Sequence, residues 1–200
     1  MDDVFYLMLF MWTCLYYVNF MTTSRKWSYV ISLFHSLIVS VKSLHYITCP
    51  DPNMLYYMMH FTLAYLTVSV VYIIQHQSEG LSVLIHHTAS ITLLYYGISA
   101  DVKYYPFINR LFLFEIPIVF LNIQLLYNGR HIRTLNGLIT LVLYFIFRFC
   151  NSWKILLLFT DLTIHEEAPM SVHAGLYTIF FVQSYWMYKI VLFLFFDDVI

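Results

Sequence analysis

Charged side chains are scarce in this sequence of 200 residues. They make up 10% of the chain, whereas about 25% is usual in soluble domains. Hydrophobic residues make up 61% of the chain, and the mean hydropathy is +0.73. This composition excludes an ordinary water-soluble globular protein and indicates an integral membrane protein.

Clusters of basic residues are also lacking. The formal net charge is -1, and no run or stripe of Lys and Arg could neutralise a row of phosphates. We therefore expect membrane lipids as partners and no nucleic acid, and the sequence leaves protein partners open.

Metal-binding patterns are missing too. The three cysteines, Cys14, Cys49 and Cys150, lack metal-type spacing, and their odd number excludes a closed disulfide framework. The clustered His-x-x-His-His segments of di-iron lipid desaturases and hydroxylases do not occur. A metal or haem oxidoreductase would have to be built on scattered histidines, namely His35, His86, His87 and His173. We therefore expect no metal and no bound cofactor.

The N-terminus has no positively charged region and no small-residue cleavage site. It opens with Asp2 and Asp3 ahead of an apolar stretch. We expect this stretch to be a retained membrane span and not a signal peptide.

Seven apolar stretches are long enough to cross a bilayer, which takes about 20 residues of helix. We place them at 4–21, 27–42, 54–74, 81–97, 107–127, 135–159 and 172–196. The connections are too short for a soluble domain, so any activity must lie within the helices or at their ends. The expected fold is an all-α, multi-pass transmembrane bundle of about seven spans.

The distribution of basic residues predicts an orientation. Arg25, Lys26, Arg130 and Arg133 fall in loops on one side, and Lys42 and Lys103 fall on the other. By the positive-inside rule the N-terminus is outside or lumenal and the C-terminus is cytoplasmic.

The first candidate site is a pair of adjacent histidines, His86 and His87, inside the fourth span. Ionisable residues within a span are costly and mark functional sites. Neighbours on a helix point about 100° apart, so we expect one imidazole to face the interior and the other a neighbouring helix. Both could instead be structural hydrogen-bonding groups.

The fifth span contains the strongest anomaly, Glu115, close to the bilayer centre. A carboxylate there must be protonated, hydrated or paired with a cation. Pro117 weakens the backbone hydrogen bonding next to Glu115. Asn122 lies on the same helix face as Glu115. We expect Arg148 in the sixth span to interact with Glu115, directly or through water.

Three further polar patterns predict helix faces. The first is a set of serines spaced four residues apart, which predicts a packing stripe: Ser32, Ser36 and Ser40. His35 lies beside this stripe, and we expect it to face a polar interior. His60 is expected at the membrane border. In the last span, a polar stripe predicts either a cavity lining or interhelical hydrogen bonding; it comprises His173, Tyr177, Ser184 and Tyr188.

These residues resemble the TLC domain, the membrane domain shared by ceramide synthases, the translocating-chain-associated membrane protein and TLC-domain lipid regulators. The resemblance runs from about residue 28 to 196. It rests on Phe34-His35-Ser36, Ile85-His86-His87-Thr88, the segment from Glu115 to Asn122 that contains Phe120-Leu121-Asn122, and Phe145-Ile146-Phe147-Arg148.

The resemblance implies a first span and loop at 1–26, followed by a TLC-like domain at 27–200. Six spans of that domain would surround a lipid-accessible cavity lined by His35, Glu115, Asn122 and Arg148. His86 and His87 would be the catalytic residues if the protein is an enzyme. The family occupies the endoplasmic reticulum, and some smaller members lie at the plasma membrane.

The sequence departs from ceramide synthases because it lacks their second His-Asp-x-x-Asp-like segment. The closer resemblance is to the non-synthase TLC proteins, so we expect a protein that handles acyl lipids and influences membrane composition. An acyltransferase with acyl-CoA as co-substrate is the alternative, because an imidazole can transfer protons or carry an acyl group. A scaffold that binds cargo and a proton-coupled transporter using Glu115 are further hypotheses.

Overall fold

The computed structural model describes residues 3–22, 25–76, 80–99, 104–127, 130–160 and 169–195, and these ranges are helical and contain no strand. Five helices are continuous: α1 (Asp3–Thr22), α2 (Arg25–Thr48), α3 (Pro52–His76), α4 (Leu81–Ser99) and α10 (Met170–Phe195). Two more are interrupted. One joins α5 (Tyr105–Phe112), a 3₁₀ turn, η2 (Leu113–Glu115), and α6 (Ile116–Leu126). The other joins α7 (Arg130–Tyr144), a π-helical turn, η3 (Phe145–Cys150), and α8 (Asn151–Thr160).

The all-α expectation is therefore confirmed, and the seven predicted stretches correspond to these seven helices. The largest error in a boundary concerns α2, which we predicted to end at residue 42 and which continues to Thr48. A lysine marks the edge of an apolar run but does not stop a helix, because Lys is a good helix former.

Five segments are long and apolar enough to cross a membrane: Lys26–Thr48, Pro52–Gln75, Leu81–Ser99, Tyr105–Leu126 and Leu135–Leu157. A shorter apolar helix covers Asp3–Val18. Over the described residues α10 is not among the five. These segments indicate an integral multi-pass membrane protein, and a count of seven spans stays a prediction.

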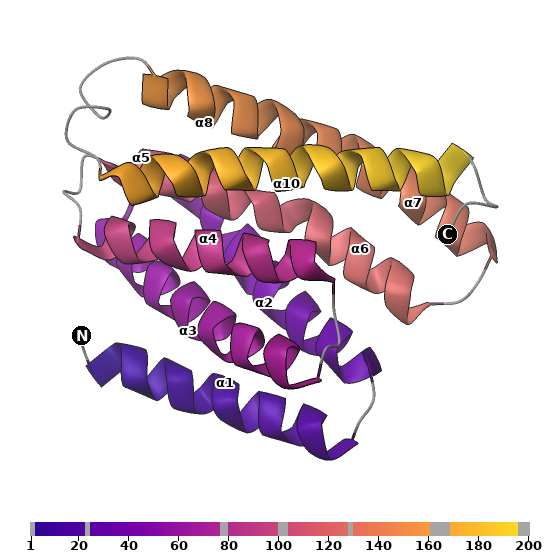
Figure 1. Ribbon diagram of the computed structural model, residues 1–200, viewed down its shortest axis with the longest axis horizontal. Coiled ribbons are helices and arrows are strands. Elements are labelled where there is room, and N and C mark those ends of the chain that lie inside the picture. Colours follow the sequence, from indigo (N-terminus) through magenta and orange to yellow (C-terminus); the bar gives the residue numbers. More distant parts are fainter. Residues whose placement is uncertain are drawn as a thin grey trace.

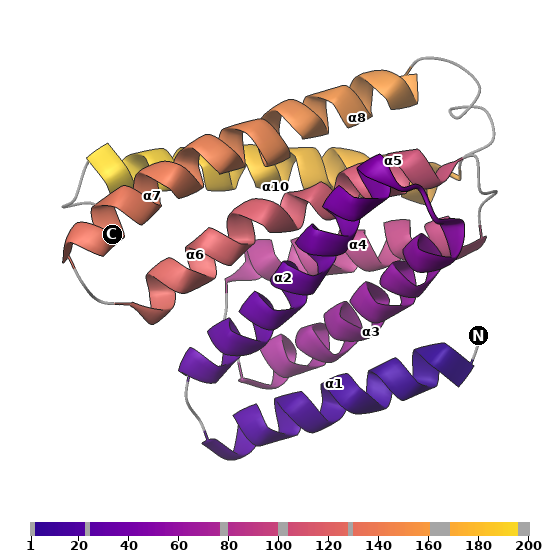
Figure 2. The ribbon, with the colours of Figure 1, turned by 180° about the vertical axis from the view of Figure 1, so that it is seen from behind.

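Six of the helices form a closed ring. Around it, α2 packs against α3, α3 against α4, α4 against α10, α10 against α7 and α8, α7 against α6, and α6 against α2 (Figures 1 and 2). The remaining helix, α1, lies outside this ring against α3 and α2. The chain thus forms six helices around a common interior and one helix at the periphery.

The peripheral helix is fixed by aromatic packing. Trp12 of α1 is fully buried, and its indole Nε1 donates a hydrogen bond to the backbone oxygen of Phe61 at 3.1 Å. The Trp12 ring also lies 5.0 Å from that of Tyr65 in α3. Aromatic pairs with such separations add to the stability gained from burial.

One end of the ring is packed solid. There the absence of a side chain at Gly97 lets α4 approach α5, because a Cβ would come within 2.6 Å of the Ile108 Cδ1 atom. Gly175 of α10 meets Leu93 of α4 in a similar way, with a Cβ contact of 3.2 Å. Ser43 Oγ donates to Asn109 Oδ1 at 2.8 Å and ties α2 to α5. Small residues at such crossings allow membrane helices to pack closely.

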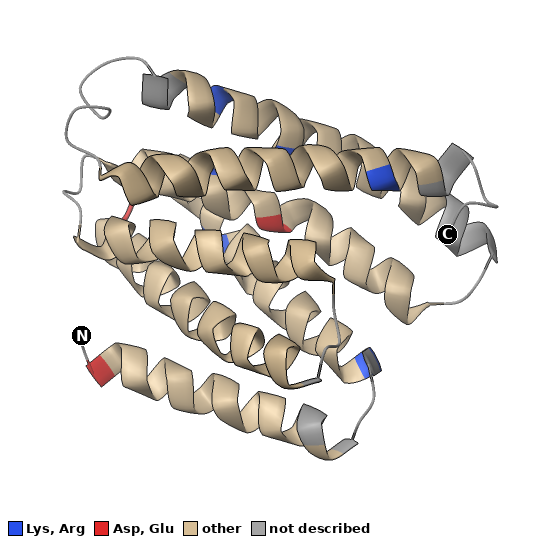
Figure 3. Ribbon diagram, viewed as in Figure 1, with Lys and Arg blue, Asp and Glu red and all other residues tan. Residues whose placement is uncertain are grey.

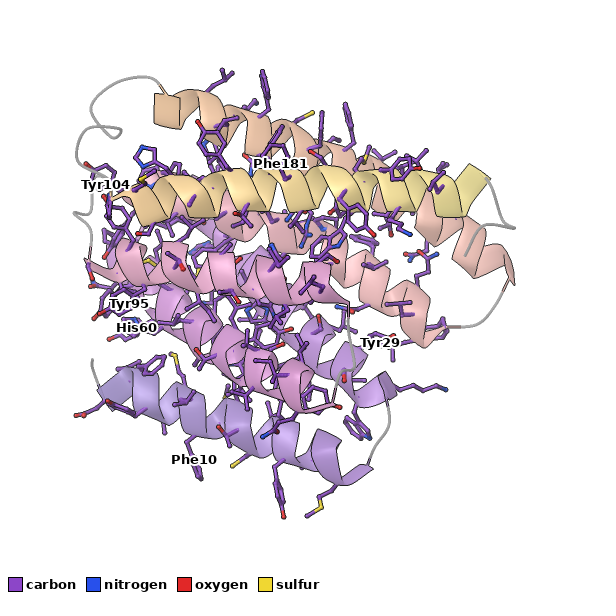
Figure 4. The ribbon with its side chains drawn as sticks, in the orientation of Figure 1. Phe10, Tyr29, His60, Tyr95, Tyr104 and Phe181 are labelled. Atoms are coloured by element: carbon purple, nitrogen blue, oxygen red, sulfur yellow. The ribbon has the colours of Figure 1, made fainter. Side chains whose placement is uncertain are left out.

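Charged residues are sparse along the helices (Figure 3). Tyr95 and Tyr104 lie at one end of the bundle, and Tyr29 lies towards the other (Figure 4). His60 lies near the same end as Tyr95, but it is buried between α1 and α3, with its ring 6.4 Å from that of Phe5. A position at the membrane border stays a prediction, and the side chain is buried because α1 covers that face of α3.

Candidate functional site

The ring encloses a cavity of about 510 Å³ that contacts every one of its six helices. Its walls are mostly apolar, and the apolar side chains include Leu66, Val83, Leu93, Leu94, Leu111, Phe112, Ile118, Leu121, Leu125, Ile179 and Ile190. Hydroxyl groups and a few ionisable side chains interrupt this apolar surface. The volume lies within the range of about 300–1,000 Å³ that is typical of small-molecule sites.

The cavity lining reaches the end of the ring where α2 and α4 begin and α3 and α6 end, and Gly80, Leu125 and Lys189 are exposed there, so we take this end as the mouth. We define this mouth by Ser28, Tyr29, Gly80, Leu125, Lys189 and Ile190. The opposite, closed end is lined by Leu93, Leu94, Leu111, Phe112 and Ile179, which also pack into the buried core described above. From Val83 to Leu94 the wall formed by α4 extends about 17 Å at the usual helical rise.

The histidine pair lies between mouth and closed end. His86 and His87 both line the cavity, with their ring centroids 5.8 Å apart. His86 also packs edge-on against Trp186 of α10 at 5.0 Å, and His87 lies 6.3 Å from the ring of Tyr65. We expected only one of them to face the interior. That expectation is wrong, because the cavity is wide enough for two side chains that diverge by about 100° to border it.

Neither imidazole is held by a hydrogen bond at Nδ1. The Nδ1 atoms of His86 and His87 are buried without a partner among the described residues. Each ring can therefore meet a ligand only through Nε2, the nitrogen that is not enclosed.

Glu115 lines the cavity from η2, and its partner is a histidine of α2. The Nδ1 atom of His35 lies 3.7 Å from the Oε2 atom of Glu115, and the contact is an ion pair when the imidazole is protonated. His35 is 1% exposed, stacks on Tyr65 at 3.9 Å and has Nε2 within 3.2 Å of the Thr62 hydroxyl. These contacts fix His35 beside the carboxylate, although it does not itself line the cavity.

Arg148 is not the direct counter-ion of Glu115 that we expected. Its Nε donates to the backbone oxygen of Phe114 at 2.7 Å, and its Nη1 donates to Gln183 Oε1 at 2.8 Å. The guanidinium also lies over the rings of Tyr144 and Trp186, at 5.1 and 5.4 Å. The structure therefore gives no direct contact between Arg148 and Glu115, and an interaction through water stays a prediction.

The backbone explains this placement of Arg148. Pro117 lacks an amide hydrogen, and the helix tightens into the 3₁₀ turn η2 just before it, as the position of the proline predicted. The Phe114 carbonyl in this turn accepts the hydrogen bond from Arg148. Arg148 itself lies in the π-helical turn η3, and such turns occur frequently at functional sites.

Asn122 lines the cavity as expected, and its Nδ2 donates to Ser32 Oγ at 3.0 Å. Ser32 borders the cavity, whereas Ser36 and Ser40 are buried. The burial of Ser36 and Ser40 agrees with the expected packing role, but Ser32 does not share it.

The polar stripe of α10 does not line the cavity. Tyr177 and Tyr188 are exposed, Ser184 bonds back to the Phe180 carbonyl at 2.9 Å, and His173 Nδ1 lies 3.2 Å from the Pro169 carbonyl. The residues of α10 at the cavity are instead Ile179, Trp186, Lys189 and Ile190. Sequence reasoning missed Lys189, although an ionisable residue inside an apolar stretch was a usable signal.

Across the described residues, no group of three or more His, Cys, Asp or Glu side chains could hold a metal ion. The histidines considered for a metal centre, His35, His86, His87 and His173, therefore do not form such a group in the described ranges.

The fold and the site define a helical, multi-pass membrane protein with an internal cavity that carries polar side chains. The chain matches no family model, no curated protein and no solved structure.

Proposed function

We propose that this protein handles acyl lipids by binding a lipid chain in the cavity within its ring of six helices. The observation that carries the proposal is an apolar, ligand-sized cavity with polar groups part-way down its wall. Apolar pockets with a few convergent polar groups are the usual form of a small-molecule site. In a membrane protein, acyl chains are the most abundant molecules that match such a lining.

The resemblance to the TLC domain supports the same proposal. Four separate sequence motifs carried it, and their polar members, His35, His86, His87, Glu115 and Arg148, come together at one level of the ring. Six helices surround the cavity and one precedes them. We propose membership of this family, with the TLC-like domain at 27–200. By the same resemblance we propose the endoplasmic reticulum as the compartment, with the plasma membrane as the alternative.

A pair of substitutions on α4 tests lipid binding in the cavity. Ser90 lines the cavity, and Thr88, two residues earlier, is exposed on the outer face of the same helix. We expect Ser90→Trp to fill the cavity and to reduce the acyl lipid that copurifies with the protein. The matched variant Thr88→Trp should retain it. Mass spectrometry of lipids extracted from equal amounts of the two variants makes the comparison, and equal lipid content would contradict the proposal.

Acyl transfer is the second candidate. It is favoured by the presence of two imidazoles and a carboxylate, His86, His87 and Glu115, in one cavity. Against it, a catalytic imidazole is normally oriented by an acceptor at its second nitrogen, and neither Nδ1 atom has one among the described residues. If the protein is an acyltransferase, membranes supplied with acyl-CoA should form a product that is absent with His87→Ala. Lipid mass spectrometry at matched protein levels measures this.

A further inference from the structure

The cavity carries more positive than negative charge. Among its described lining residues, Arg148 and Lys189 are cationic and Glu115 is anionic. Glu115 has a partner of its own in His35, at 3.7 Å. The wall therefore holds one surplus positive charge, and it holds two when His35 is protonated.

No carboxylate of the described residues is in contact with Arg148 to neutralise its charge. Its hydrogen-bond acceptors are the Phe114 carbonyl, the Gln183 amide oxygen and, at 3.5 Å, the Tyr144 hydroxyl. These groups solvate a guanidinium but carry no negative charge. A cation that is 1% exposed inside a membrane protein is costly without a counter-charge. An anion in the cavity would offset that cost.

The histidine pair can supply direct hydrogen bonds to such an anion. A buried N–H group without an acceptor is rarer and more costly than an unpaired acceptor. The enclosed Nδ1 atoms of His86 and His87 therefore favour the tautomer with the proton on Nε2. Both imidazoles then present an N–H donor to the cavity that Arg148 also lines. His86 is linked to Arg148 through Trp186, whose ring contacts both the His86 ring and the guanidinium.

The closed end sets the orientation of the ligand. Below His86 and His87 the wall is mostly apolar, with Leu93, Leu94, Leu111, Phe112 and Ile179, and Ser90 adds one hydroxyl on α4. From His87 to Leu94 it extends about 10 Å along α4. Towards the mouth the lining regains polar groups, including Ser28, Tyr29, Ser69 and Lys189. A chain would thus occupy the closed end, and its head group would lie at the level of the histidines.

We propose that the ligand of the cavity is a single-chain amphiphile with an anionic head group, a carboxylate or a phosphate, bound with its chain towards the closed end. The head group accepts hydrogen bonds from His86 and His87 in the field of Arg148, and Lys189 attracts it at the mouth. This inference rests on the proposed function, and it specifies the head group.

Native mass spectrometry of the purified full chain tests it. The protein is offered an equimolar mixture of decanoate, decyl phosphate, decanol and decylamine, whose single short chains match the closed end. We expect retention of one or both anions in preference to the alcohol and the amine, and the anion that dominates identifies the head group. Lys189→Gln should lower this preference several-fold, and Glu115→Gln should raise it about tenfold, since it removes the negative charge of the wall. Lys154→Gln, which removes an exposed lysine of α8 outside the cavity, should leave it unchanged.

The outcomes separate the two proposals. Binding of all four amphiphiles without preference, or preference for the amine, would overturn the anionic head group and leave chain binding intact. An equal effect of Lys189→Gln and Lys154→Gln would overturn the role of Lys189 at the mouth. Retention of none of the four would contradict the lipid-binding function itself.

Discussion

His35 and Glu115, eighty residues apart in the sequence, meet at 3.7 Å in the interior of the ring. His35 comes from α2 and Glu115 from η2, and these elements pack against each other. The carboxylate that looked isolated in the fifth span is therefore accompanied by an imidazole.

We expect this pairing to show as thermodynamic coupling. The variants His35→Gln, Glu115→Gln and the double variant should be non-additive in thermal unfolding, by about 1 kcal/mol, as is usual for residues in contact. The corresponding cycle with Arg148→Gln and Glu115→Gln should show weaker coupling, because those side chains are not in contact. Equal coupling in the two cycles would argue that Arg148 is a direct partner after all.

Arg148 should be the most sensitive charged residue for stability. Arg148→Met removes the guanidinium donor of the Phe114 carbonyl and leaves Gln183 Oε1 with the Tyr144 hydroxyl as its donor. A buried group left unsatisfied costs about 1–3 kcal/mol. Lys154→Met, at an exposed position, is the control and should change the melting temperature little. A loss in Arg148→Met no larger than that in Lys154→Met would contradict the assigned hydrogen bonds of Arg148.

The closed end should tolerate no added volume at Gly97. Gly97→Ala places a Cβ within 2.6 Å of Ile108 Cδ1 and 3.2 Å of the Met59 sulfur, and we expect a loss of about 1–3 kcal/mol from overpacking. Gly80→Ala is the control, because its nearest contact would be 4.0 Å. Ile108→Val removes the clashing methyl group and should relieve Gly97→Ala. Thermal unfolding of the purified variants measures each effect.

Cysteine labelling tests the predicted orientation. Cys49 is exposed just after α2, at the end we predict to be lumenal or outside. In a background of Cys14→Ser and Cys150→Ser, it should react with a membrane-impermeant maleimide applied from that side. A Lys26→Cys variant that also carries Cys49→Ser should be labelled from the cytoplasmic side only. The reverse pattern would mean that the positive-inside rule misassigned this chain.

The helices themselves could be predicted from the sequence because each is a long apolar run bounded by polar residues. The histidine pair, Glu115, Asn122 and Arg148 could also be selected, because polar groups within a span are rare and costly. Selecting these residues required no knowledge of which helices pack together.

The faces of the helices could not be predicted equally well. In α10, apolar residues occur all round the helix, so hydropathy does not indicate which side turns inwards. The stripe from His173 to Tyr188 has regular spacing and yet lies away from the cavity, while Trp186 and Lys189 line it. Near Arg148 the π-helical turn η3 changes the helix face on which the following residues lie. A regular repeat of 3.6 residues per turn does not predict this change.

The closed end of the cavity also has a kinetic consequence. Among the described residues, the helices at the far end are packed together by Gly97, Gly175 and the Ser43–Asn109 hydrogen bond. A molecule that enters past Lys189 therefore meets a closed wall at that end and does not pass through it. The transporter hypothesis would require the far end to open. Substituting the side chains that seal this end would then reveal the opening as a leak across the membrane.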